Sequence, residues 1–107
     1  MFDVTHNDIK KAIIKNKSVV AIVAAMSKCT TCEEWIPNIL EPLCKENNIE
    51  IYRVDLDKEF VLLPPAHTPT TYFYVSGHRD PMIVIGPEPI ENMIERIKVC
   101  FNELSNI

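Results

Sequence analysis

The chain has 107 residues, of which 47% are hydrophobic and 24% charged, the balance of a globular protein with one modest core. Its formal charge of −4 argues against a nucleic-acid-binding protein, because such proteins present a basic face. No apolar run is long enough to span a membrane, and the N-terminus lacks the pattern of a secretory signal. We therefore expect a cytoplasmic protein that binds neither nucleic acid nor membrane. In that compartment the four cysteines are expected to be thiols or a catalytic pair rather than structural bridges.

The first quarter of the chain predicts a strand, a helix and a second strand. Phe2 to Val4 is a short candidate edge strand. Thr5 can cap a helix that continues through Ile13, because the apolar residues that follow have helical spacing. From Ser18 to Met26 the sequence is apolar and rich in β-branched residues, which predicts a central strand covered on both faces.

The middle of the chain predicts a long helix followed by a strand. Apolar residues recur on one helical face from Thr31 to about Asn47. Pro37 lies inside this helix and should kink it, because proline has no N–H to donate to the carbonyl one turn earlier. Ile51 to Leu56 is the next strand. Beyond it, adjacent prolines at 64 and 65 leave room for at most a helical turn near Lys58 to Leu62.

The last third predicts a hairpin and a C-terminal helix. Strands are expected at Thr70–Val75 and Met82–Ile85, joined by a turn at Ser76-Gly77-His78. Pro89 suits the first position of a helix whose apolar stripe runs from Ile90 to Leu104. The alternation of strands and helices predicts an α/β layered domain.

Two cysteines, Cys29 and Cys32, stand three positions apart where the central strand gives way to a helix. Unpaired N–H groups and the helix dipole stabilise a thiolate at a helix N-terminus, and the thiolate is the nucleophile in disulfide exchange. This arrangement indicates Cys29 as the attacking thiol and Cys32, one turn further on, as the more buried resolving thiol.

A zinc site and an accidental pair of core cysteines are the alternatives for the same motif. Zinc needs about four ligands, and no second pair of ligands accompanies this one, because Cys44 and Cys100 are isolated on apolar stripes and are expected to be core thiols. His67 could approach the pair as a proton acceptor, although a solvent-exposed loop histidine is the simpler interpretation. We expect no metal.

The layout as a whole resembles the thioredoxin family. Cys29 and Cys32 match its active-site pair, Pro37 matches the proline that kinks its active-site helix, and Thr68-Pro69-Thr70 matches its cis-proline loop. The remaining matches are Arg53-Val54-Asp55-Leu56-Asp57 at the end of the third strand, and Gly77 and Gly86 in the hairpin and before the last helix.

The resemblance implies one thioredoxin-like domain over residues 1–107. Its three layers would be a central mixed β-sheet flanked by helices, with the third helix reduced. The resemblance also implies a redox disulfide between Cys29 and Cys32, and a cis bond before Pro69. Such a bond would turn the Thr68 backbone toward Cys29, so that Thr68 and Pro69 would bind an extended substrate segment.

Two departures from the family pattern bear on activity. Lys28 stands where thioredoxins have a tryptophan, and Val23 stands where they have a buried aspartate that helps to deprotonate the resolving thiol. Lys28 should favour the Cys29 thiolate, whereas Glu33 and Glu34 oppose it.

The resemblance implies a thiol-disulfide oxidoreductase that exchanges a protein or glutathione disulfide through Cys29 and Cys32 and needs no metal or organic cofactor. Its partners would be disulfide-containing proteins, with a thioredoxin-reductase-like protein or glutathione as electron donor. The alternative hypothesis is a thioredoxin-fold binding module that docks a partner through Cys29, Trp35 and Pro69 without redox turnover. For Trp35, an ordinary role in packing is an equally good interpretation.

Overall fold

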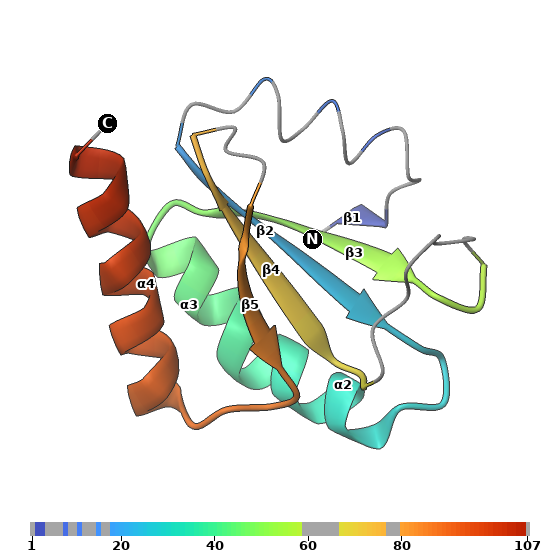
Figure 1. The fold of residues 1–107 in the computed structure, drawn as a ribbon. Coiled ribbons are helices and arrows are strands. Elements are labelled where there is room, and N and C mark those ends of the chain that lie inside the picture. The colour runs from blue at the N-terminus through green and yellow to red at the C-terminus, as the bar shows by residue number, and fades with distance from the viewer. Residues whose placement is uncertain are drawn as a thin grey trace.

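A five-stranded mixed sheet forms the centre of the computed structural model, which describes residues 2–3, 8, 11, 15, 18–58, 67–76 and 80–106. The strand order is β1-β3-β2-β4-β5 (Figure 1). Strands β1, β3 and β2 run parallel to one another, and β4 and β5 are antiparallel to their neighbours. The bounds are Phe2–Asp3 for β1, Val19–Ala25 for β2, Glu50–Asp55 for β3, Thr70–Val75 for β4 and Met82–Ile85 for β5.

Strand β2 is the central strand, and all seven of its residues are buried. Alternate side chains of a strand point to opposite faces of the sheet. One set, which includes Val19 and Val23, joins the main apolar cluster, and the other set, Val20 and Ile22, joins a second cluster with Val54. Both faces of β2 are therefore covered, as its continuous apolar sequence predicts.

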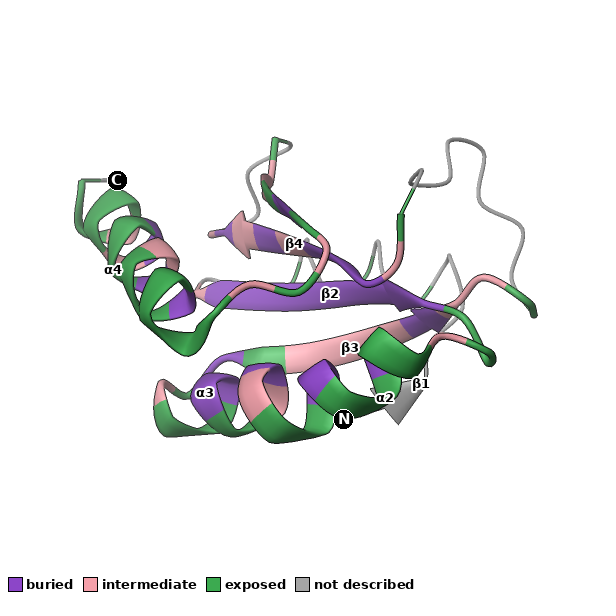
Figure 2. Cartoon of the chain, turned by 90° about the horizontal axis from the view of Figure 1, so that it is seen from below, coloured by how far each residue is buried: buried purple, intermediate pink, exposed green. Residues whose placement is uncertain are grey.

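Four helical segments, three of them consecutive in the chain, pack on the face of the sheet that carries the main cluster (Figures 1 and 2). Each contributes buried apolar side chains to that cluster. The segments are α2 (Thr30–Trp35), the π-helix η1 (Ile36–Leu40), α3 (Glu41–Glu46) and α4 (Ile90–Ser105). The sheet and these helices form the α/β arrangement that the sequence predicts.

The long helix predicted over 31–47 is present, but a π-helical turn interrupts it where Pro37 stands. Pro37 has no N–H, so the carbonyl of Glu33 lacks its usual α-helical donor. The N–H of Glu41 instead bonds to the carbonyl of Ile36, five residues earlier, and the helix continues as α3 beyond this wider turn. Pro42, a second proline without an N–H, lies in the first turn of α3.

Several sequence predictions fall on residues outside the described part of the chain. Of the helix predicted to follow Thr5, Asp8, Lys11 and Lys15 are described and are helical. The predicted short helix near 58–62, which is the reduced third helix, lies almost entirely outside the described residues. So does most of the turn at 76–78. Pro89 is described, and it stands one position earlier than predicted, as the residue before the first helical residue of α4.

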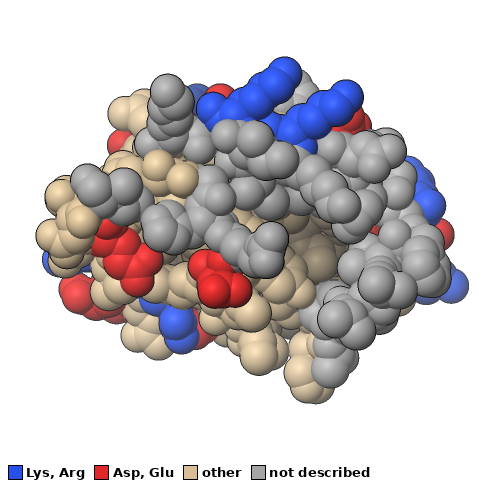
Figure 3. Space-filling model, turned by 45° about the horizontal axis from the view of Figure 1, so that its top comes forward, with Lys and Arg blue, Asp and Glu red and all other residues tan. Residues whose placement is uncertain are grey.

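The surface shows side chains of both charge signs. On the face drawn in Figure 3, acidic and basic side chains both occur among the described residues. No helix within the described ranges has the length and apolar character to cross a membrane.

Ile97 and Ile94 in α4 provide a matched test of this packing, because one is 3% exposed and the other 38%. Replacing Ile97 with alanine removes apolar contacts inside the main cluster and should lower the free energy of unfolding by about 2–5 kcal/mol. The same change at Ile94 should cost less, about 1–2 kcal/mol, because a larger part of its side chain stays exposed to solvent in the folded state. Urea unfolding of both variants measures the difference. Equal losses would mean that α4 does not bury the face described here.

Candidate active site

A disulfide joins Cys29 to Cys32 at the point where β2 leads into α2. The two Cα atoms are 5.2 Å apart, as the three-residue spacing at the start of a helix allows. The side chain of Cys29 is half-buried, whereas Cys32 has an exposed fraction of 0%. One sulfur therefore lies near solvent and the other lies within the main apolar cluster.

Two donors surround the sulfur of Cys29. Cys29 is the N-cap residue of α2, and its Sγ accepts a hydrogen bond of 3.1 Å from the backbone N–H of Cys32. The hydroxyl of Thr31 lies 3.3 Å from the same sulfur. When the disulfide is reduced, both groups can donate to a Cys29 thiolate, and hydrogen bonds to the charged form lower a pKa. The sequence motif indicates the helix-end N–H, but the part of Thr31 becomes visible only in the structure.

The loop before β4 approaches Cys29 from the other side. The peptide bond between Thr68 and Pro69 is cis, and the carbonyl oxygen of Thr68 lies 3.6 Å from Cys29 Sγ. Thr68 is half-buried, while Pro69 is buried. The carbonyl of Pro69 accepts a hydrogen bond of 2.8 Å from Gly86, whose φ of +76° is one that glycine adopts readily. The end of β5 therefore holds this loop beside the cysteine pair.

A carboxylate fixes the segment that leads into Cys29. Asp57, just past β3, accepts a 2.7 Å hydrogen bond from the backbone N–H of Ser27 through its Oδ2. Hydrogen bonds from the hydroxyl and the N–H of Ser27 lower the pKa of Asp57, and the nearby charges of Lys28 and Lys58 lower it further. Asp57 thus remains a carboxylate at neutral pH and restrains the turn before the active-site pair.

Trp35 connects the active-site helix to the start of α4. Its indole is 6% exposed, and its Nε1–H donates a 2.8 Å hydrogen bond to the carbonyl of Glu88. The Glu88 carboxylate accepts hydrogen bonds from both Nε, at 3.0 Å, and Nη2 of Arg96. Sequence reasoning missed this connection, because Trp35 and Glu88 are 53 residues apart and meet only in the tertiary fold. The eight-residue separation of Glu88 and Arg96 has no recognisable local pattern either.

The structure settles the surroundings of the other residues singled out from the sequence. Cys44 and Cys100 are buried free thiols, as predicted, and burial raises their pKa values to about 12 and about 11. His67 is exposed, in agreement with the simpler interpretation. Among the described residues, no group of three or more metal-ligating side chains comes together. The docking surface of the alternative hypothesis needs correction, because two of its three residues, Trp35 and Pro69, are buried by packing and present little side chain to a partner.

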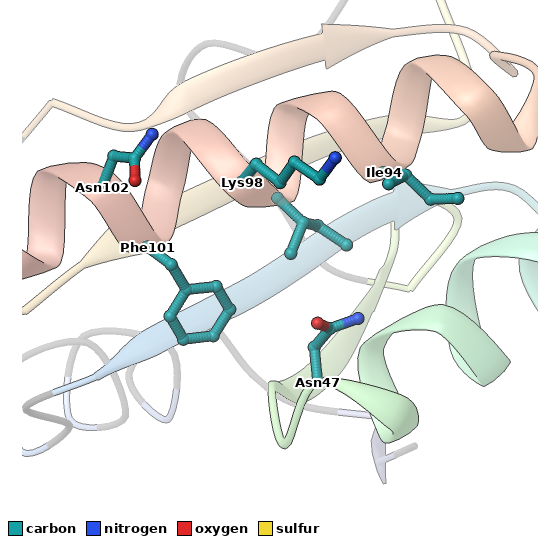
Figure 4. A pocket seen from close by; sticks show the side chains of 6 residues that line it. Asn47, Ile94, Lys98, Phe101 and Asn102 are labelled. Atoms are coloured by element: carbon teal, nitrogen blue, oxygen red, sulfur yellow. The ribbon is translucent and has the colours of Figure 1, made fainter.

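A groove of about 300 Å³ lies away from these groups, between α4 and Asn47, the residue that follows α3 (Figure 4). It is open to solvent and combines apolar with polar side chains, and it includes none of the residues around the disulfide. Its lining residues are Asn47, Ile94, Ile97, Lys98, Phe101 and Asn102.

Comparisons with known proteins assign the fold. No family model matches the chain, and no curated protein matches it in sequence. Among solved structures, the thioredoxin of Malassezia sympodialis (Mala s 13) is similar over 94% of this chain and 90% of its own, with a TM-score of 0.69 and 19% identity. Chloroplastic thioredoxin z is similar over 95% of both chains, with a TM-score of 0.81 and 15% identity. The chain therefore has the thioredoxin fold, as its sequence pattern implies.

Replacing Thr31 with valine should raise the pKa of the Cys29 thiol in the reduced protein. The valine has a similar shape but cannot donate to the thiolate. Because Thr31 is exposed, the rise should be below about one unit, less than a buried charge-assisted hydrogen bond would give. The rate of alkylation as a function of pH gives the pKa. Thr30→Val is the matched control and should leave it unchanged, and an equal shift in both variants would argue against the Thr31 hydrogen bond.

Replacing Glu88 with glutamine should destabilise the fold at neutral pH but not in acid. Hydrogen bonding to Arg96 holds the pKa of Glu88 below its ordinary value of 4.5. A depressed carboxylate pKa stabilises the fold fully above the unfolded value, and this stabilisation disappears as the pH falls through the folded value. Urea unfolding near neutral pH and in acid tests this. Glu95→Gln, which breaks an exposed pair with Lys98, should change little at either pH; an equal loss from Glu88→Gln at both pH values would exclude the ion pair as its cause.

Proposed function

We propose that this protein is a thiol-disulfide oxidoreductase, with Cys29 as nucleophile and Cys32 as resolving thiol. The observation that carries the proposal is the asymmetry of the pair. Cys29 is half-exposed at a helix N-cap with two hydrogen-bond donors, whereas Cys32 is fully buried beside it. This is the environment that lowers the pKa of one thiol and protects the other.

The proposed cycle transfers two electrons from the dithiol to a substrate. The Cys29 thiolate attacks one sulfur of a substrate disulfide, and the other substrate sulfur leaves as a thiolate that takes a proton from water. Cys32, after losing its proton, attacks Cys29 in the resulting mixed disulfide. The bond between Cys29 and the substrate breaks, the second substrate sulfur leaves as a thiolate, and the Cys29–Cys32 disulfide remains.

Protein disulfides are the proposed substrates, and Thr68 and Pro69 are the proposed substrate-binding residues. The carbonyl of Thr68 lies beside the reactive sulfur, so an extended segment that pairs with this backbone would present its own disulfide to Cys29. The buried Pro69 would act by holding Thr68 in place. Reduction would then require a thioredoxin-reductase-like protein or glutathione as electron donor. The cycle needs no metal or organic cofactor, and the cytoplasmic location and the single-domain organisation stay predictions.

A docking module without redox turnover is the second candidate. The burial of Trp35 and Pro69 removes most of the surface that this candidate requires, and the disulfide between the two cysteines favours the oxidoreductase.

Replacing Cys32 with serine should trap substrates. Without a resolving thiol, the mixed disulfide at Cys29 cannot be released, so substrate proteins should remain covalently attached until a reductant is added. Cys29→Ser is the matched control and should trap nothing, because the remaining thiol is buried. Non-reducing gels of cell extracts incubated with each variant, followed by identification of the eluted proteins, measure the difference.

The same variants separate the two candidate functions. If neither variant traps a protein while the native chain retains a partner without a covalent bond, the oxidoreductase proposal is wrong and the docking module is supported. Trapping by Cys29→Ser alone would instead reverse the roles of the two cysteines.

A further inference from the structure

One buried hydroxyl on the sheet face beneath the helices lacks a hydrogen bond. Thr71, the second residue of β4, is 0% exposed, and its Oγ1 finds no partner among the described residues. Burying a hydroxyl without a hydrogen bond destabilises a fold, and a valine of nearly the same shape would avoid that cost. The presence of threonine at this position therefore needs an explanation.

The sheet register places Thr71 in the layer that contains the resolving cysteine. Thr71 is the register partner of Val23 in β2 and of Val84 in β5. Both valines belong to the main apolar cluster, and so does Cys32. Register partners on adjacent strands point to the same face of a sheet, so the Thr71 side chain also faces this cluster. Along the chain it stands three residues from Thr68, whose carbonyl contacts Cys29.

A buried hydrogen-bond donor would help Cys32 to resolve the mixed disulfide. Cys32 must become a thiolate before it can attack, but the interior opposes ionisation of a thiol. The effect is visible at two other cysteines of the same cluster, since burial raises the pKa of Cys44 to about 12 and that of Cys100 to about 11. The backbone N–H of Cys32 itself is directed at the sulfur of Cys29. A further hydrogen-bond donor would therefore speed the step.

We propose that the Thr71 hydroxyl stabilises the Cys32 thiolate by a hydrogen bond, direct or through one water molecule, while the mixed disulfide is resolved. This inference rests on the proposed function. Thr71 acts as a donor and not as a base: it keeps its own proton, and the proton of Cys32 passes to water. The thiolate electron pair forms the bond to Cys29, and the electron pair of the broken bond leaves with the substrate sulfur.

We assign the pH dependence of the resolving step to Cys32, because the residues next to Thr71 in the sheet offer no other group that ionises near neutral pH. Next to Thr71 in the sheet, Val23 and Val84 do not ionise, and the row continues in β3 with Arg53. From α4, Met93 and Ile97 contribute apolar side chains. Cys29 is bonded to the substrate at this stage. On the described helices, the thiols Cys44 and Cys100 are buried in this layer, and the carboxylates Glu33 and Glu34 on α2 are exposed. Glu41 on α3 and Glu103 on α4 act on Cys44 and Cys100.

Thr71→Val tests the proposal with dithiobis(nitrobenzoate) as the disulfide probe. The reduced protein should release nitrobenzoate thiolate in two phases, first when Cys29 attacks and then when Cys32 resolves. In Thr71→Val the second phase should slow roughly tenfold near neutral pH, and its pH profile should move up by about one unit, as expected for loss of a hydrogen bond to a charged group. The first phase should not change.

Thr71→Ser and Thr71→Ala complete the test. Serine keeps the hydroxyl and should retain the native pH profile, whereas alanine lacks it and should show the same shift as valine. A thermal melt of Thr71→Val at or above the native temperature would show that the slow phase does not come from a damaged fold. If Thr71→Val does not fold, the pH profiles of the second phase in Thr71→Ala and Thr71→Ser test the proposal instead.

The outcomes distinguish this inference from the proposed function. A second phase with the native pH profile in Thr71→Val or Thr71→Ala overturns the part assigned to Thr71 and leaves the oxidoreductase intact. If the native protein itself shows no second phase and forms no Cys29–Cys32 disulfide, the proposed function fails.

Discussion

The complete burial of β2 is the constraint from which the arrangement of the site follows. The strand is covered on both faces and pairs with β3 on one side and β4 on the other, and these two registers place its ends. Ala24 of β2 pairs with Thr70 of the antiparallel strand β4, so the last residues of β2 and the first residues of β4 lie side by side at the same end of the sheet. The loop that carries Cys29 and the loop that carries Thr68 consequently meet there, although 39 residues separate them in the chain.

At this end of the sheet the two sulfurs lie in different environments. In the proposed cycle, this difference decides which cysteine attacks and which one resolves. Cys29 combines access to solvent with donors that stabilise a thiolate. Cys32, one turn into the helix, lies among apolar side chains that protect it from outside reagents and oppose its ionisation. In the proposed cycle, the packing that shields Cys32 from outside reagents also makes its ionisation the more demanding step. A hydrogen bond from Thr71 in the same layer would then have a larger effect than one from the same group at the surface.

The sequence predicted the strands and the cysteine pair well, because these depend on local signals. Apolar continuity identified β2, and the three-residue spacing at a strand–helix junction indicated an exchange pair, for which the resemblance to the thioredoxin family implied the disulfide. Pro37 marked an irregularity, but its form, a π-helical turn, depends on how the following residues pack. The bond from Trp35 to Glu88 and the unsatisfied hydroxyl of Thr71 could not be predicted, because each follows from residues that only the tertiary fold brings together.

A redox titration of the purified protein in glutathione and dithiothreitol buffers, read by counting alkylated cysteines in a mass spectrum, tests the central claim most directly. Reversible exchange predicts one two-electron transition in which Cys29 and Cys32 gain or lose alkylation together, while Cys44 and Cys100 stay thiols throughout. The midpoint should lie in the range of known exchange proteins, about −120 to −270 mV. A Cys29–Cys32 pair that does not convert reversibly in these buffers, or two cysteines that change independently, would contradict the account.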